Sequence, residues 1–282
     1  MFVVFTHSLR RSVSAMIGWG LSLGLLGYFM IGFYDTFADQ SAVLENLLAQ
    51  YPPELMAFFG DQSGGMFTPE GFLTLEFFSY MPLVIGIFAV QAGSRLIVTD
   101  EESGILDLTM AHPVSRSAFF LGRLLAHVVT LISILGITWL AFFIGGEKSV
   151  GLDFTAGELA RPFISLFATL FLFSGLSLFL SLILPSRSLS TMVSGLLLTA
   201  SYFIQSLSNI NADLKDIAQY LPLKYYQSGG ALNGLNSEWA AGLIGFGLLF
   251  SALGWTLFVR RDIRVSGEGS WRLPFVKKVK QA

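Results

Sequence analysis

The sequence predicts an all-α integral membrane protein, built as one domain of six transmembrane helices with short amphipathic helices at the membrane surfaces. Of its 282 residues, 53% are hydrophobic and 13% are charged, and the mean hydropathy is +0.66, whereas about a quarter of the residues of a soluble domain are charged. The apolar residues gather into runs of about 20, the length that crosses a bilayer core. Lys and Arg gather at alternate ends of these runs, as they do in membrane proteins of fixed orientation.

The apolar runs give the order of the expected spans. The first contains no charged residue, and the second follows Thr68-Pro69-Glu70, in which Thr is a favourable N-cap and Pro a favourable first helical residue. Strands of a β-barrel are excluded because the runs are continuously apolar and too long. The six expected spans are 13–33, 73–98, 118–144, 162–184, 189–207 and 239–259.

The basic residues predict the orientation, because cytoplasmic segments near helix ends carry the excess of Lys and Arg. With both termini in the cytoplasm, 13 of the 17 basic residues lie inside and 4 outside. The first run is too long for a signal peptide and lacks a small-residue cleavage site, so it is expected to remain as an anchor. The domain 1–282 then divides into an interface helix at 1–12, a six-span bundle at 13–259 and a basic cytoplasmic tail at 260–282. The inner residues are Arg10, Arg11, Arg95, Arg116, Arg123, Arg187, Arg260, Arg261, Arg264, Arg272, Lys277, Lys278 and Lys280, and the outer ones are Lys148, Arg161, Lys215 and Lys224.

Two outer segments are long enough to have structure of their own. The first, 42–59, has apolar residues at partly helical spacing around Pro52-Pro53, which predicts two short amphipathic pieces on the outer leaflet. The second, 209–237, mixes aromatic, Pro and Gly residues as an interfacial or re-entrant element does. Both are equally compatible with ordinary extracellular loops.

The spans carry few groups that could couple transport to an ion gradient. The first, fourth, fifth and sixth have no charged residue in their interiors, while Glu76, Arg95 and Arg123 lie near helix ends and can reach an interface. His127 is the single titratable group well inside a span, where a lone His is more often structural than a proton relay. The chain therefore has no evident source of free energy of its own.

No catalytic, cofactor or metal site is expected on this chain. The nearest match to a phosphate loop, 145–149, has Glu147 between Gly and Lys and no preceding strand. The three His residues lie on different elements, without a second ligand at metal spacing. The absence of Cys excludes disulfides and thiol chemistry, and the net charge of −2 gives no indication of a nucleic-acid partner.

The most informative segment is 99–117, on the cytoplasmic side between the second and third spans. Thr99 and Glu102 have the spacing of a capping box, which predicts a helix of about three turns starting there. Pro113 ends this helix, and Ser115 can cap the third span. The helix is too short to cross the membrane. Two interpretations are open: its acidic start and apolar residues fit a groove on a soluble partner, or it only joins two spans along the interface.

This segment resembles the cytoplasmic-loop signature of ABC type 2 exporter permeases. The resemblance rests on Glu101-Glu102-Ser103-Gly104-Ile105-Leu106-Asp107 followed by Ala111-His112-Pro113-Val114-Ser115-Arg116. Ser103 and Ile105 depart from the family's more usual Arg or Lys and Thr. The layout of six spans agrees over the whole chain, and Leu221-Pro222-Leu223-Lys224-Tyr225-Tyr226 resembles the family's Pro-aromatic segment before the last span.

The resemblance implies the permease subunit of an ATP-driven exporter in the cell (inner) membrane. Two permease copies, or this chain and a homologue, would meet in the lipid bilayer, each docked on an ABC ATPase that binds ATP and Mg; no nucleic acid takes part. The segment 1–12 matches the family's interface helix. Small-residue pairs at Gly20/Gly24 and Gly195/Thr199 suit helix packing within the chain or a dimer seam. The residues expected to face the ATPase are Glu101, Glu102, Gly104, Ile105, Leu106, Asp107, Pro113 and Arg116.

The apolar path favours an amphiphilic or hydrophobic substrate, such as a drug, a peptide or a lipid-like molecule. Two other classes of function remain open from the sequence. An ion-coupled secondary transporter would run without ATP, and a membrane scaffold would use the same loop to bind partners without transport.

Overall fold

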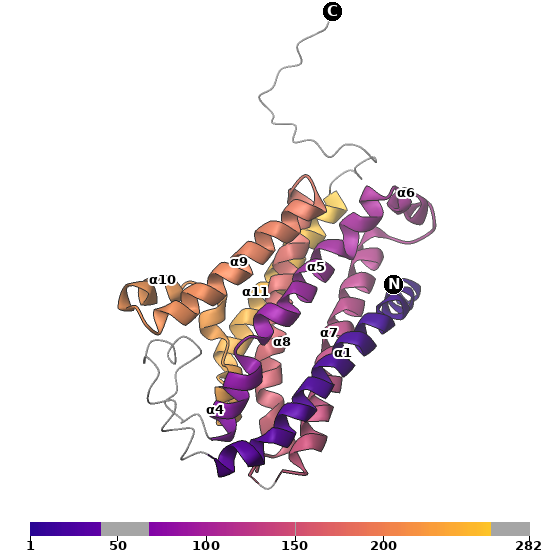
Figure 1. Ribbon diagram of the computed structural model, residues 1–282. Helices are drawn as coiled ribbons and strands as arrows, with labels where there is room; N and C mark the ends of the chain where they lie inside the picture. The colour runs from indigo at the N-terminus through magenta and orange to yellow at the C-terminus, as the bar shows by residue number, and fades with distance from the viewer. Residues whose placement is uncertain (41–67, 150, 261–282) are drawn as a thin grey trace, which may run out of the picture.

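The protein folds as a bundle of long helices (Figure 1). The structure, a computed structural model, describes residues 1–40, 68–149 and 151–260, and every regular element within them is helical. Five helices are long and apolar enough to cross a membrane, which confirms the all-α class and makes this a multi-pass membrane protein. The expected outer pieces at 42–59 and the tail beyond residue 260 lie outside the described residues. The five helices are α1 (Phe2–Asp39), α5 (Met81–Glu102), α7 (Arg116–Gly146), α8 (Ala156–Ile183) and α11 (Ser237–Arg260).

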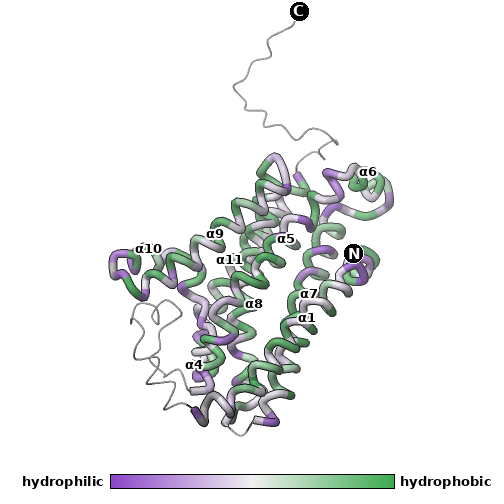
Figure 2. The backbone as a smooth tube through the Cα atoms, viewed as in Figure 1, coloured by the Kyte–Doolittle hydropathy of each residue, from purple (hydrophilic) through white to green (hydrophobic). Residues whose placement is uncertain are grey.

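Hydropathy along the chain follows the bundle. In Figure 2 the long helices are mostly green, while purple segments gather at their ends and in the short connections. The short elements are α4 (Pro69–Leu73), a π-helical turn (Thr74–Phe78), α6 (Ile105–Met110), α10 (Lys215–Ala218) and three 3-10 turns (Ala212–Leu214, Pro222–Tyr225 and Ser228–Leu232).

A sixth long helix, α9 (Arg187–Ser208), has 22 residues but is not among the five apolar ones. Its length of about 33 Å is enough to cross a bilayer core. Five of its six serines face inward, with Ser190 and Ser194 fully buried, whereas Met192 and Leu196 are 63% and 67% exposed. This arrangement, small polar residues inside and apolar ones outside, is the one that suits lipid. The serines lower the average hydropathy without being on the outer face, and the count of six spans stays a prediction.

The predicted interface helix, 1–12, and the predicted first span, 13–33, are parts of one continuous helix in the structure. α1 runs without a break from Phe2 through the first apolar run; no Pro separates the two parts, and Ser12 donates to the Ser8 carbonyl over 3.1 Å instead of capping a new helix. It packs along α7. A Cβ atom added at Gly24 would lie 3.1 Å from the Cβ of Ala141, so the small residue allows the two helices to approach closely.

The predicted second span, 73–98, is interrupted in the structure. α4 and the π-helical turn end at a turn, Ser79-Tyr80, before α5 begins. Pro82 explains the break, because it has no N–H for the carbonyl four residues earlier, that of Phe78. The Tyr226 hydroxyl donates to this carbonyl over 2.8 Å instead. Thr68 caps α4 as predicted, its Oγ1 accepting from Gly71 N at 3.2 Å.

Helix α8 is the centre of the bundle and packs against both α5 and α11. At the closest approach to α5, a Cβ on Gly93 would lie 2.2 Å from the carbonyl oxygen of Ser174, so only Gly fits there. Around α8, two aromatic clusters fill the ends of the bundle. One contains Phe77, Phe78, Phe142 and Phe163, and the other Phe119, Phe120 and Phe258.

Candidate functional site

The candidate site is the end of the bundle that carries α6, the N-terminus and the start of α9 (Figure 1). We call it the α6 end. There α5 ends, α6 follows it, and α7 runs from α6 back into the bundle.

The connection into α6 differs from the one predicted. α5 continues through Thr99 to Glu102, so the two residues of the expected capping box lie inside a helix that is ending. Ser103 follows, its Oγ donating to the carbonyl of Thr99 over 2.8 Å. Gly104 has φ of 70°, the left-handed conformation that closes many helices, and only then does α6 begin. The acids are therefore at the end of α5, and the capping-box prediction was wrong.

α6 has one buried and one exposed side. Leu106 is 1% exposed and packs among apolar residues that include Phe119 and Phe258. Ile105 and Leu108, by contrast, are 51% and 70% exposed. Of the residues expected to face a partner, Glu102, Gly104, Ile105, Asp107, Pro113 and Arg116 have at least partial exposure, whereas Glu101 and Leu106 are buried inside the fold.

The return from α6 is fixed at two points. Ser115 caps α7 as predicted, with its Oγ 3.2 Å from the amide of Ala118. Arg116 donates from Nη1 to the carbonyl of Phe258 over 3.3 Å, which ties the start of α7 to the last turns of α11. The segment that follows α6 is thus fixed to α7 and to the end of α11.

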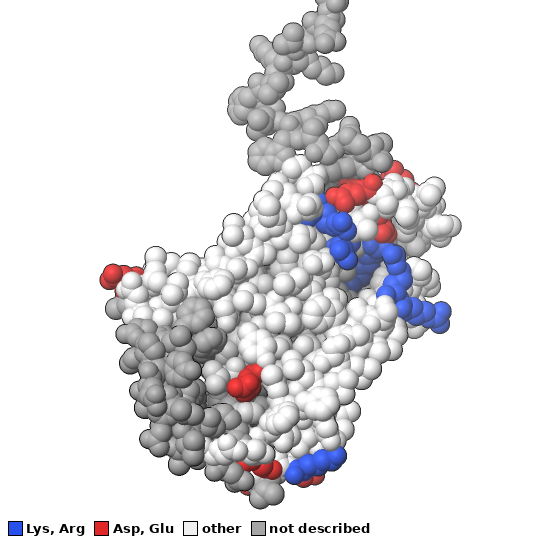
Figure 3. Space-filling model, viewed as in Figure 1, with Lys and Arg blue, Asp and Glu red and all other residues white. Residues whose placement is uncertain are grey.

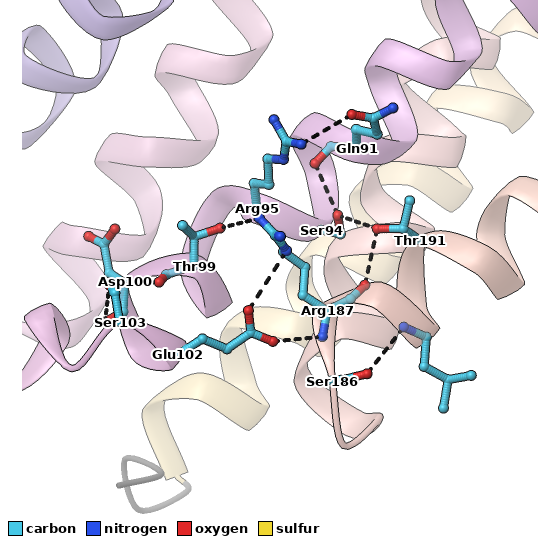
Figure 4. Close-up of polar contacts among 11 residues, drawn as sticks. Gln91, Ser94, Arg95, Thr99, Asp100, Glu102, Ser103, Ser186, Arg187 and Thr191 are labelled. Atoms are coloured by element: carbon cyan, nitrogen blue, oxygen red, sulfur yellow. Dashed lines mark hydrogen bonds and ion pairs between the residues drawn. The ribbon is translucent and has the colours of Figure 1, made fainter. Parts of the chain in front are cut away.

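Acids at the end of α5 are placed unfavourably, because the C-terminal end of a helix carries partial negative charge. Two arginines from other helices compensate for it. The Arg123 guanidinium of α7 pairs with Asp100 and donates to the carbonyl of Leu96 over 2.6 Å. Arg187 of α9 donates its backbone N–H to Glu102 over 2.9 Å, and its Nε lies 3.8 Å from the same carboxylate (Figure 4). The first pair joins the end of α5 to α7, and the second joins it to α9.

The same arginines line a cavity of about 430 Å³ between α1, α5, α7 and the start of α9. Arg11 and Arg95 also line it, and among the described lining residues Asp100 is the single acid. The sequence analysis missed this cavity, because its residues are on four elements that only the fold brings together. Figure 3 shows the basic side chains gathered at this end of the molecule.

The glycine pair in α1 is used within the chain. A Cβ on Gly20 would lie 3.0 Å from Ile137 of α7, so of the two roles predicted for Gly20 and Gly24 the structure shows helix packing. Gly195 has no heavy atom within 4 Å of an added Cβ, and Thr199 is exposed. This second pair lies on the open face of α9.

At the opposite end of the bundle, the described residues form no arrangement that suggests nucleotide chemistry. The segment 145–149 ends α7, and Lys148 lies against Tyr28, with Nζ 2.8 Å from the Tyr hydroxyl. Across the ranges that the structure covers, no group of three or more His, Asp or Glu residues could hold a metal ion.

Comparison with known protein families gives a match over most of the chain. The family model described as "ABC-2 family transporter protein" matches residues 3–262. A search of curated proteins finds no match.

Proposed function

The chain belongs to the ABC-2 transporter family, and from this premise we propose that it is the permease subunit of an ATP-driven exporter in the cell (inner) membrane. Its substrate would be amphiphilic or hydrophobic, consistent with spans that are almost free of charge. Both termini and α6 would lie in the cytoplasm. The excess of Lys and Arg at the α6 end supports this orientation.

The observation that carries the proposal is the exposed side of α6. Ile105 and Leu108 present apolar surface on a short helix at the α6 end, where the described part of the fold leaves them exposed. Asp107 adds an exposed charge beside them. A short helix with apolar anchors and a charged edge suits a groove on a soluble partner.

That partner would be an ABC ATPase, which binds ATP and Mg and supplies the energy. The chain itself has no phosphate loop, as its sequence indicates. Movement of the ATPase would reach the spans through α6, since Leu106 is embedded between α7 and α11 and the two arginine pairs join the end of α5 to α7 and α9.

Two permease copies, or this chain and a homologue, would form the transport path between them. The open face of α9, with Gly195 and Thr199 among exposed apolar residues, supports an interface there, because small residues allow helices from two chains to approach closely. Gly20 and Gly24 are covered by α7 of the same chain, so they do not support an interface between two chains.

The test compares two matched substitutions in the permease expressed with its ATPase. Ile105→Asp on α6 and Ile217→Asp on α10 change residues that are each 51% exposed on a short helix. Ile105→Asp should reduce the ATPase recovered with the purified permease at least tenfold, whereas Ile217→Asp should leave it unchanged. Equal recovery with both variants would contradict docking at α6.

The wider proposal has its own test in liposomes. The permease alone should neither hydrolyse ATP nor move cargo when a proton or sodium gradient is imposed. Gradient-driven transport without nucleotide would replace the exporter with a secondary transporter.

A further inference from the structure

The cavity at the α6 end has features of a binding site that docking of an ATPase does not require. We infer that it binds the phosphate-bearing headgroup of an anionic amphiphile, with the apolar tail of the ligand lying between α1 and α5. The inference concerns this chain alone and does not depend on the ATPase partner.

The charge in the cavity is unbalanced. Four guanidinium groups line it, and the one carboxylate in its wall, that of Asp100, is already paired with Arg123. Arg187 has Glu102 nearby, but Arg11 and Arg95 have no carboxylate within ion-pair distance in the described parts of the chain. Arg95 instead donates to the Gln91 side chain over 3.2 Å (Figure 4). Four arginines around one cavity, two of them without a counter-charge, favour an anion, and phosphate is one whose oxygens match guanidinium donors well.

Two buried polar atoms on the cavity wall also lack a partner. Nε of Arg123 and Nε2 of His127 make no hydrogen bond to any described residue. They are one turn apart on α7, and His127 is 5% exposed. Buried donors are normally satisfied, and Arg Nε–H can only donate. Almost no surface of either atom is accessible, so a bound acceptor would reach Arg123 Nε–H only after the lining side chains move.

The lining also has an apolar part, beside uncharged polar residues such as Ser12 and Thr130. Ala15, Phe88, Ala92 and Ala126 line the cavity together with the basic groups. Phe88 of α5 is in contact with Trp19 of α1, with ring centroids 5.7 Å apart, so Trp19 lies beside the apolar part of the cavity. The volume is in the range of pockets that hold whole small molecules rather than one ion.

The position of the cavity suits a molecule with a tail. α1 packs along α7, while α5 packs against α8 and α9, so the cavity lies between two groups of helices. Its basic residues Arg11, Arg95 and Arg187 are near the α6 end of their helices, and Phe88 lies two turns deeper along α5 than Arg95. A ligand with a charged head and an apolar tail matches this order, whereas a free phosphate would leave the apolar part unfilled.

The test uses the full-length protein in a neutral detergent and a phosphatidylglycerol with brominated acyl chains. Bromine quenches tryptophan fluorescence at short range, and the signal of Trp19 is the difference between wild type and Trp19→Phe. We expect phosphatidylglycerol to quench Trp19 at a concentration at least tenfold lower than brominated phosphatidylcholine does. Equal quenching by the two lipids would overturn the inference.

Variants and a soluble competitor separate the remaining explanations. Arg11→Gln with Arg95→Gln should weaken the phosphatidylglycerol signal at least tenfold, and Arg10→Gln, which removes a neighbouring charge outside the cavity, should leave it unchanged. A similar loss with Arg10→Gln would mean general attraction to a basic surface and would refute a built site. Glycerol phosphate should not displace the lipid, and displacement at lipid-like concentration would show a soluble-anion site instead.

Discussion

Replacing Asp100 by Asn should destabilise the protein, although it removes an acid from the end of α5. The carboxylate pairs with Arg123, and the two side chains are 10% and 12% exposed. Breaking a buried pair costs about 3–5 kcal/mol, because the remaining charge is left without compensation. The cavity beside Arg123 brings water to one side, so we expect about 3 kcal/mol, at the low end of that range. This corresponds to roughly 150-fold in the folding equilibrium.

The sign of the change separates two effects. If the helix dipole dominated, removal of an acid from a C-terminal end would stabilise α5 by about 0.3–1 kcal/mol. If the ion pair dominates, the variant is less stable. The free energy of unfolding can be measured by SDS titration in mixed micelles, followed by circular dichroism.

Glu102→Gln is the matched control at the same end of the same helix. Its carboxylate lies 3.8 Å from Arg187 Nε, and the side chains are 33% and 43% exposed, so the loss should be below about 1 kcal/mol. A double-mutant cycle of Asp100→Asn with Arg123→Gln should give a coupling energy above about 1 kcal/mol. If Asp100→Asn unfolds within about 0.5 kcal/mol of wild type, the buried pair does not hold this end together.

Three further predictions concern packing, topology and the break before α5. Gly24→Leu should cost about 1–3 kcal/mol of stability by forcing α1 from α7, measured by the same titration. A Cys at Ser188 should be protected from an impermeant maleimide in intact cells and one at Asn211 should be labelled, because α9 separates them; labelling on the same side would remove the sixth span. Tyr226→Phe should cost about 1–3 kcal/mol, since the Phe78 carbonyl is left buried without its donor.

Two of these predictions have matched controls in the chain. Gly32 has nothing within 4 Å of an added Cβ, so Gly32→Leu should be neutral, and an equal loss there would contradict the packing argument. Tyr220 is 82% exposed, so Tyr220→Phe should not change stability. Desolvation holds the pKa of the Tyr226 hydroxyl well above its ordinary value. The hydroxyl therefore stays protonated, and its contribution to the free energy of unfolding should be constant through neutral pH.

The positions of the long helices could be predicted because apolar runs and caps are local signals. The caps at Thr68 and Ser115 are in the structure as expected. The interruption before α5 also had a local signal, Pro82, which the continuous hydropathy of the run obscured. The hydrogen bond from the Tyr226 hydroxyl to the freed Phe78 carbonyl could not be predicted, because Tyr226 is far along the chain.

The error at Thr99 shows how one motif fits two structures. A Thr with Glu three residues later occurs inside helices as well as at their starts, and here Gly104 was the stronger signal, since it marks the end of α5. At the start of α8 a true capping box went unused in the prediction. Thr155 and Glu158 form it, but the span was predicted to begin only at Pro162, where the apolar run begins. The basic cavity had no signal in any single segment.

The length of α1 also has a mechanical consequence. Its 38 residues make a rod of about 57 Å, nearly twice the thickness of a bilayer core of about 30 Å. One end carries Arg11 at the cavity, and near the other end Asp35 accepts from Ser149 Oγ over 2.6 Å and from Gly151 N over 3.0 Å. A rod without a hinge behaves as a lever, so a tilt of roughly 10° about its middle moves each end by about 5 Å in opposite directions. Opening the cavity by tilting α1 would therefore pull on the loop after α7 at the far side of the membrane.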